Sequence, residues 1–393
     1  MYKYLIAFLF FVMPLFGQQK LNTVMVDSTT YNYYLNGSWT ELISLGKMAL
    51  SEDIDFKFLQ QRMGYAYFMK RNFYAAIKHY ENALKFDADD PVSHTYLYYS
   101  AVNINDEAMA RYHFSKLDAD NQALLKVKKT RLVDAVDVEY NYKINDDNSL
   151  NDVTIGDLRN NPTYKRVGLN SLLGYRFSLY QSYSNYSQIT EITNQTIQNE
   201  YYVAGNVSLY SRTSLMGAYH YVGTTLKSES DNLKMPGNLW FAKLTHSFNR
   251  FDVSLSRSHF SNDYVDATQT GLQLGFLLPT KSKIYLKSSL YTLADTDSTR
   301  LVFNQTIGAL IARRFWLQGS VTLGNLNNYV DNNALYLYNS IDHTTFRTGA
   351  SLFYYLGKHF TLFGNYTFDK KLIIDTQYKY KQHSIAGGII WKI

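Results

Sequence analysis

Two kinds of hydrophobic pattern divide the chain near residue 131. From Trp39 to Leu124 the apolar residues recur at a helical spacing with short polar breaks, which predicts helices. From about residue 132 to the end, apolar and polar residues alternate, as they do in strands with one apolar face. The pattern therefore predicts a helical part followed by a β part. The predicted helices are Trp39–Leu50, Asp55–Met69, Phe73–Phe86, Pro91–Val102 and Glu107–Leu117.

The strand predicted at Val136–Ile144 illustrates the alternation. One of its faces carries Val136, Val138, Tyr140, Tyr142 and Ile144, and the other carries Asp137, Glu139, Asn141 and Lys143. About fourteen such segments follow one another, within a range of roughly 12 to 16, and each is about ten residues long. A tilted strand needs that length to cross the hydrocarbon layer of a membrane. The β part, residues 131–393, is therefore predicted to be an antiparallel outer-membrane β-barrel.

The connections between the predicted strands alternate in length and in charge. Tight, mostly basic turns are predicted near 174–176, 211–214, 249–251, 279–282, 313–315 and 357–359. Long, acidic connections are predicted near 145–161, 191–200, 227–238, 261–267, 294–299, 329–334 and 370–377. Short periplasmic turns and long outer loops are typical of outer-membrane barrels. None of the long connections is an obvious plug, although 145–161 is long enough to fold inward.

Composition narrows the class of protein. The chain has 36 Tyr and 23 Phe but a mean hydropathy of only −0.28, so it lacks the long aliphatic runs of helical membrane proteins. Residues 131–393 carry a net charge of +5 and residues 18–130 a net charge of zero, without the basic stripe of a nucleic-acid-binding protein. The absence of cysteine excludes disulfides, thiolate metal sites, cysteine nucleophiles and a lipoprotein anchor. We therefore expect no cofactor, no metal and no nucleic-acid partner.

The first residues resemble a signal peptide, predicted to span residues 1–17. Lys3 provides the charged start, Tyr4 to Phe16 form the apolar core, and cleavage is expected after Gly17. Thirteen residues of helix reach only about 20 Å, which is too short to cross a bilayer. The alternative is a retained anchor. The mature chain is then expected in the outer membrane, with residues 18–130 as a periplasmic helical module.

One segment of the helical part resembles a tetratricopeptide repeat. The small and aromatic residues that pack the two helices of such a repeat recur here at the expected offsets, and a weaker copy follows with Ala110 and Phe114. The resemblance implies helix pairs that stack on one another and offer a groove to partners. The alternative is a purely structural collar. The predicted repeat-packing residues are Gly64, Tyr67, Ala76, Tyr80 and Ala83.

A repeat module joined to a C-terminal barrel resembles the YaiO-type outer-membrane proteins. It resembles, more distantly, the porins that export cellulose and poly-N-acetylglucosamine. The tract Gly174–Ser184 is also similar to barrel proteins of Bacteroidetes. The final strand, with Ile385, Trp391 and Ile393 on one face, resembles the segment that the barrel-assembly machinery recognises. The resemblance implies that machinery and outer-membrane lipids as partners, and an architecture of module plus barrel.

The first functional hypothesis is a non-enzymatic conduit, or a component for export or assembly of an envelope polymer or protein. A barrel of about fourteen strands encloses a wider lumen than an eight-stranded one. Polar side chains on the inner face would then line a mildly basic passage. The predicted lumen-lining residues are Lys143, Arg166, Arg176, Gln269, Gln273 and Gln318.

Two alternatives remain open from the sequence. In the first alternative, the barrel serves only as an anchor, and residues 18–130 recruit a periplasmic protein or polymer. In the second, the barrel is a lipid hydrolase, for which His259 beside Ser258 is the best-placed pair on a strand. A lone strand histidine among many serines is more often structural, so the chain is expected not to be an enzyme. No phosphate loop, dinucleotide fingerprint, zinc-helix motif or calcium loop is present in the sequence.

Overall fold

The computed structural model describes most of the chain beyond its first twenty residues. The predicted signal peptide, residues 1–17, lies outside the described part. So do most of the predicted connection 145–161 and a few residues in other connections. The described residues are 21–104, 106–125, 130–146, 161–189, 195–228, 231–248, 250–278, 280, 282–296, 298–339, 342–373 and 377–393.

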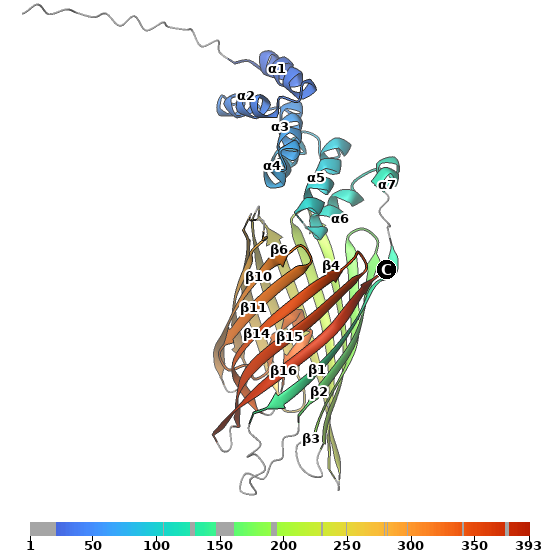
Figure 1. Ribbon diagram of the computed structural model, residues 1–393, viewed down its shortest axis with the longest axis vertical. Helices are drawn as coiled ribbons and strands as arrows, with labels where there is room; N and C mark the ends of the chain where they lie inside the picture. The colour runs from blue at the N-terminus through green and yellow to red at the C-terminus, as the bar shows by residue number, and fades with distance from the viewer. Residues whose placement is uncertain are drawn as a thin grey trace, which may run out of the picture. The chain divides into compact units, whose positions relative to one another are not determined.

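Seven helices precede the barrel in the described part of the chain (Figure 1). Five of them are the predicted helices, with ends shifted by up to three residues. Several helices begin at a residue whose side chain accepts a hydrogen bond from an N–H of the first turn. Asn72 caps α4 in this way. Asp90 caps α5, and Pro91 follows it as the first helical residue. The bounds are α1 Thr23–Leu35, α2 Trp39–Ser51, α3 Lys57–Met69, α4 Phe73–Ala83, α5 Pro91–Asn103, α6 Glu107–Ser115 and α7 Ala119–Leu125.

The chain divides into two compact units, residues 1–104 and residues 105–393. The first unit contains α1–α5, and the second contains α6, α7 and all the strands. Within the second unit, α6 packs on the turns that join barrel strands. The Phe114 and Tyr175 rings lie 4.6 Å apart, and His113 Nε2 lies 2.8 Å from the Ser211 hydroxyl. No described helix combines the length and the apolar character needed to cross a membrane.

Fourteen antiparallel strands close into a barrel, which confirms the predicted fold class (Figure 1). Consecutive barrel strands are neighbours all the way round, and β1 pairs with β16 to close the sheet. The strands are β1 Arg131–Asn145, β2 Thr163–Leu173, β3 Phe177–Ile189, β4 Gln195–Tyr210, β5 Thr213–Lys227, β6 Asn232–Ser247, β7 Phe251–Ser261, β8 Asp266–Leu277, β9 Tyr285–Ala294, β10 Thr299–Ala312, β11 Phe315–Leu323, β14 His343–Leu356, β15 Phe360–Ile373 and β16 Tyr378–Lys392.

Many strands are longer than the ten residues predicted. β4 and β6 each have 16 residues, and they include much of what the sequence predicted as the long connections 191–200 and 227–238. These stretches are polar, so the alternation that identifies a lipid-facing strand fades in them although the hydrogen-bonded pairing continues. The expected strand length and loop lengths were therefore wrong there, whereas the strand number was right.

The barrel wall has an apolar outer face. Leu244, Leu255, Leu272 and Leu290 lie opposite one another on four successive strands, and each is 42–58% exposed. Their neighbours along each strand point inward and, apart from Tyr291, are polar or small. An apolar outer band on a closed antiparallel barrel is the arrangement that suits lipid on the outside.

The connection between β11 and β14 folds into the barrel. Its residues 325–339, here called the luminal hairpin, contain the short strands β12 Tyr329–Asp331 and β13 Tyr336–Tyr338, joined by a 3-10 turn at Asn332–Ala334. Side chains from β1, β4, β5, β6, β8 and β14 contact it from around the wall. The prediction of an outer loop at 329–334 was therefore wrong, and the connection that folds inward is one that the sequence did not mark as a plug.

Candidate functional site

The turn of the luminal hairpin is held in an uncommon backbone conformation. Asn332, Asn333 and Ala334 all have positive φ, at 47°, 58° and 69°. Asparagine tolerates this left-handed region better than other residues that carry a Cβ, whereas alanine is strained there. Such strain persists only where the surroundings hold the backbone in place. Several contacts from the barrel wall do so here.

Polar side chains on β4, β5, β6 and β8 bind the backbone and turn of the hairpin. Gln269 makes a double contact with Val330: its Nε2 donates to the Val330 carbonyl at 2.8 Å, and its Oε1 accepts from the Val330 N–H at 3.0 Å. The Tyr202 hydroxyl donates to the Asn333 carbonyl at 2.8 Å, and Lys243 Nζ donates to Asn333 Oδ1 at 2.6 Å. The bonds from Gln269 and Tyr202 satisfy backbone groups that folding has removed from bulk water, and the bond from Lys243 holds the Asn333 side chain.

Apolar packing reinforces this side of the hairpin. Val330 and Ala334 belong to a buried cluster inside the barrel, formed with inward residues of β4 to β7. Leu326 and Tyr329 belong to a second cluster, formed with β9 and β10. The wall residues of the two clusters are Tyr202, Ala204, Ala218, Leu239, Phe241, Phe260, Tyr291, Leu293 and Val302. Inward apolar residues are unusual in a polar lumen, and here they form the surface against which the hairpin packs.

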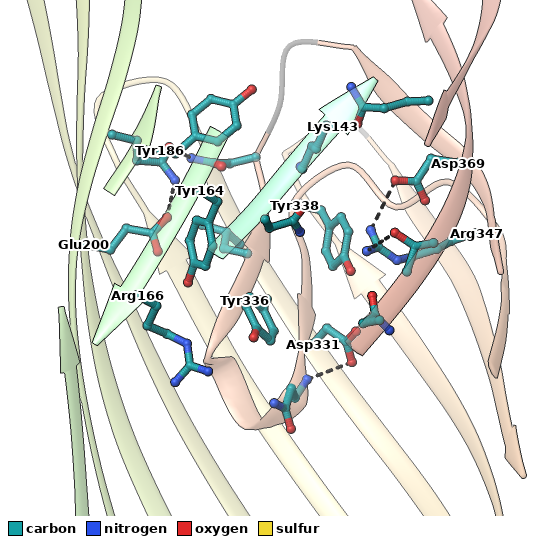
Figure 2. A pocket seen from close by; sticks show the side chains of 18 of the residues that line it. Lys143, Tyr164, Arg166, Tyr186, Glu200, Asp331, Tyr336, Tyr338, Arg347 and Asp369 are labelled. Carbon is teal, nitrogen blue, oxygen red and sulfur yellow. Dashed lines mark hydrogen bonds and ion pairs between the residues drawn. The ribbon is translucent and has the colours of Figure 1, made fainter. Parts of the chain in front are cut away.

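A cavity of about 750 Å³ remains beside the hairpin. We call its part between the hairpin and the inward faces of β14, β15, β16 and β1 to β4 the open side of the lumen. Figure 2 shows Tyr336 and Tyr338 of the hairpin there, facing charged side chains of the wall. The hairpin makes polar and aromatic contacts on this side: Tyr336 donates to Glu139 Oε2 at 2.8 Å, and Arg347 lies 4.9 Å from the Tyr338 ring.

Two arginines of the open side are engaged with carboxylates. Arg166 binds Asp137 at 2.6 Å and Glu139 at 2.8 Å, and it also contacts the Tyr180 hydroxyl. Arg347 lies 3.3 Å from Asp369. The charges of these arginines are therefore neutralised by carboxylates of the wall, and the ion pairs hold neighbouring strands together.

Lys143 differs from these arginines. Among the described residues its ammonium has no carboxylate within ion-pair distance, and it lies 5.6 Å from the centre of the Tyr186 ring. The nearby charged groups are Lys371, Arg347, Asp369 and Glu200. This ammonium is therefore a cation presented to the cavity.

His220 on β5 joins the hairpin to a buried carboxylate, Glu200, on the neighbouring strand β4. His220 Nδ1 lies 2.8 Å from the Ala334 carbonyl, so this nitrogen carries the proton and donates. Its Nε2 lies 3.4 Å from Glu200 Oε2, and Glu200 also accepts from the Ser184 hydroxyl at 2.6 Å. The histidine thus helps to hold the strained turn at Ala334 against the wall.

The sequence-predicted lumen residues fall into three groups. Lys143, Arg166 and Gln318 line the cavity. Gln269 is buried against the hairpin, and Gln273, on the same face of β8, donates to the Tyr291 hydroxyl at 2.6 Å. Arg176 lies instead in the turn between β2 and β3, with its guanidinium 5.8 Å from the Tyr112 ring of α6.

Sequence reasoning missed the hairpin residues of the site and most of the wall facing them. Tyr336 and Tyr338 fell in or beside a connection that was expected outside, although Tyr336-Leu337-Tyr338 is too apolar for an exposed polar loop. Glu139 was recognisable, because it shares a strand face with Lys143. The sequence could not show which residues of β14 and β15 lie near β1, because that depends on the register of the closed sheet. These residues are Arg347, Asp369 and Lys371.

In the first unit, the predicted repeat-packing residues lie at the contact between α3 and α4. A Cβ on Gly64 would come within 2.9 Å of the Tyr80 ring, so only glycine allows this approach. Ala76, Tyr80 and Ala83 are at most 1% exposed, and the Tyr67 ring stacks on His79 at 5.2 Å.

Several titratable groups of this unit have shifted pKa values, His79 and Asp90 among them. Burial, together with Lys78 and Lys47, lowers the pKa of His79 to about 4. Its Nδ1 lies 2.7 Å from Gln60 Oε1, which fits a neutral ring that donates to the amide oxygen. For Asp90, burial alone would raise the pKa, but hydrogen bonds from Ser93 and Gln61 and the charge of Lys57 outweigh it and lower the pKa.

The candidate hydrolase pair does not form. Ser258 is 3% exposed on the inner face of β7, whereas the side chain of His259 is 45% exposed on the other face. The imidazole lies instead 3.3 Å from the Thr268 hydroxyl and 3.7 Å from Asp266. Across the described ranges, no cluster of three or more histidine or acidic side chains is placed to hold a metal ion.

The chain matches no protein-family model and no curated protein. Solved outer-membrane barrels are similar to it in fold. The Ralstonia pickettii toluene transporter TbuX is 7% identical, over 68% of this chain and 90% of that one, with a TM-score of 0.47. A bacterial polysaccharide outer membrane secretin is 8% identical, over 67% and 100%, with a TM-score of 0.41. The KdgM porin in complex with disordered oligogalacturonate is 9% identical, over 65% and 99%, with a TM-score of 0.33.

Proposed function

We propose that this protein is a non-enzymatic outer-membrane conduit whose lumen is narrowed by the luminal hairpin. The observation that carries the proposal is the cavity of about 750 Å³ inside a barrel with a continuous apolar outer band. The outer band suits hydrocarbon, whereas charged, amide and tyrosine side chains line the cavity and suit a hydrated solute.

The hairpin restricts the conduit unevenly. Its apolar packing and its bonds from Gln269, Tyr202 and Lys243 hold it against the β4–β10 wall. Solute then passes on the open side of the lumen, between the hairpin tyrosines and the charged wall. A passage of this kind admits small polar solutes and excludes folded proteins. An extended envelope polymer passes only in single file.

Solute uptake by liposomes tests the proposal. Vesicles with the purified full-length protein should swell in solutions of small polar solutes, such as arabinose or glycine. They should not swell in dextran. Vesicles without protein, and vesicles with an unrelated barrel of closed lumen, are the controls. Absence of uptake both for the full-length protein and for a variant without the hairpin would rule out a conduit.

A second function, recruitment of a periplasmic partner, is supported by the first unit. Its helices α1–α5 present large apolar side chains, with Val24, Leu35 and Phe58 each more than 50% exposed. The close α3–α4 pair around Gly64 fits the tetratricopeptide resemblance. Such a module joined to a barrel is the YaiO-type arrangement, and the tract Gly174–Ser184 favours a Bacteroidetes origin. In this arrangement a protein or polymer of the periplasm docks on the helices. The assembly machinery recognises β16, and the barrel anchors the chain among outer-membrane lipids.

Site-specific photocrosslinking tests the recruitment function. A crosslinker at Phe58 of the full-length chain in cells should give a discrete adduct. The same crosslinker at an exposed outer-face position such as Leu255 should not give it. Identical adducts from both positions, or none from Phe58, would remove the support for recruitment.

A further inference from the structure

We propose that the open side of the lumen binds acidic oligosaccharides, with Lys143 as the cation that recognises their carboxylates. This inference rests on the proposed conduit and specifies its substrate class. Three features of the cavity support it: its carboxylates are engaged by the protein, the Lys143 ammonium has no carboxylate partner in the described part of the chain, and tyrosines and amides line the remaining wall.

The carboxylates that line the cavity accept hydrogen bonds from groups of the protein, and Asp331 does so from the Asn332 N–H at 2.7 Å. Glu139 is bound by Arg166 and by the Tyr336 hydroxyl, and Asp369 by Arg347. Asp342 accepts from the Tyr380 hydroxyl at 2.7 Å, and Glu200 is surrounded by Ser184, Gln198 and His220. A carboxylate that already accepts such bonds has little capacity left for a cationic ligand.

Lys143 presents the opposite situation. Within the described part of the chain no carboxylate lies within ion-pair distance of its ammonium. Lys371 is a second cation near it, whereas the nearby Arg347 is paired with Asp369. An ammonium has three donors and a flexible stem, so it can follow a mobile anion from one position to the next. The low dielectric of the barrel wall strengthens the attraction for an anion that enters.

The remaining walls favour a saccharide over a simple anion. Tyr186, Tyr336 and Tyr338 give flat apolar rings with hydroxyls at their edges. Side-chain amides stand among them, and each amide can both donate and accept. A sugar ring matches this combination, because it has C–H faces and a rim of hydroxyls. The cavity volume also lies within the roughly 300–1,000 Å³ of ordinary ligand sites. The lining amides are Gln188, Gln198, Asn328, Asn339, Asn365 and Gln382.

Isothermal titration of the full-length protein in detergent tests the inference without requiring conductance. A uronic-acid tetrasaccharide should bind at least tenfold more tightly than a neutral tetrasaccharide of the same linkage. Added salt should weaken only the charged ligand. Lys143→Gln should weaken the charged ligand about five- to tenfold and leave the neutral one unchanged.

The matched control is Lys165→Gln, because Lys165 lies on the neighbouring strand β2 but is exposed on the outer face. This variant should bind both saccharides as the unaltered protein does. Equal binding of the two saccharides, binding of neither, or an unchanged affinity in Lys143→Gln would overturn the inference. Because uptake by liposomes is measured separately, a conduit without this preference would refute the ligand class alone.

Discussion

At the scale of single residues, two glutamines of one strand face have different tasks. Gln269 and Gln273 both point inward from β8, and sequence analysis could not distinguish them. The structure separates them, because Gln269 binds the hairpin backbone through both amide atoms, whereas Gln273 binds a wall tyrosine. Gln269 therefore binds the hairpin directly, whereas Gln273 reaches it only through Tyr291, which packs against Tyr329.

Gln269→Ala is expected to loosen the hairpin. The substitution leaves the N–H and the carbonyl of Val330 without partners, which costs about 1–3 kcal/mol. Single-channel recordings should then show more time in a state of higher conductance. Gln273→Ala is the comparison, because Gln273 does not contact the hairpin itself, and it should change the pattern much less. If both substitutions change the recordings equally, Gln269 has no special role in positioning the hairpin.

At the scale of elements, the sequence predicted the kinds of element better than their extent. Five helices and the strand count follow from the 3.6-residue and two-residue periods. Helix α1 was missed, because its β-branched and tyrosine-rich sequence shows little helical periodicity and its start depends on the Asn22 cap. The luminal hairpin was missed because its polar turn resembles any outer loop. What directs it inward is apolar packing on distant strands, which no local pattern records.

The contact between α3 and α4 should weaken in mild acid because of His79. Its pKa is about 4 in the folded chain but about 6.5 when unfolded, so between these values the unfolded chain binds the extra proton. Stability is therefore lost as the pH falls through this window, by up to about 3 kcal/mol. Thermal melting of the helical circular-dichroism signal of the full chain, between pH 7 and pH 4.5, measures the loss.

The control for this pH effect is His79→Gln, which keeps a polar group near Gln60 but cannot titrate. It should flatten the dependence of the melting temperature on pH in that window. A slope equal to that of the unaltered chain would show that another group causes the acid sensitivity.

At the scale of the whole molecule, the outer face of the barrel determines where the protein resides. Leu272 lies within the apolar outer band, and a lysine there would have to be buried in hydrocarbon. We expect Leu272→Lys to destabilise the barrel in lipid by about 2–4 kcal/mol. Gln273→Lys, one residue further and facing the lumen, should cost much less. Folding into lipid vesicles, followed by heat-modifiable migration in gels, compares the two variants.

The central claim is that the barrel is a conduit narrowed by the luminal hairpin. Single-channel conductance in planar bilayers tests it most directly, with the full-length protein beside a variant in which a short Gly-Ser linker replaces residues 328–338. The account predicts small, steady conductance for the unaltered protein and a several-fold larger one for the variant. Equal conductance of the two proteins, or a sealed barrel in both, would contradict it.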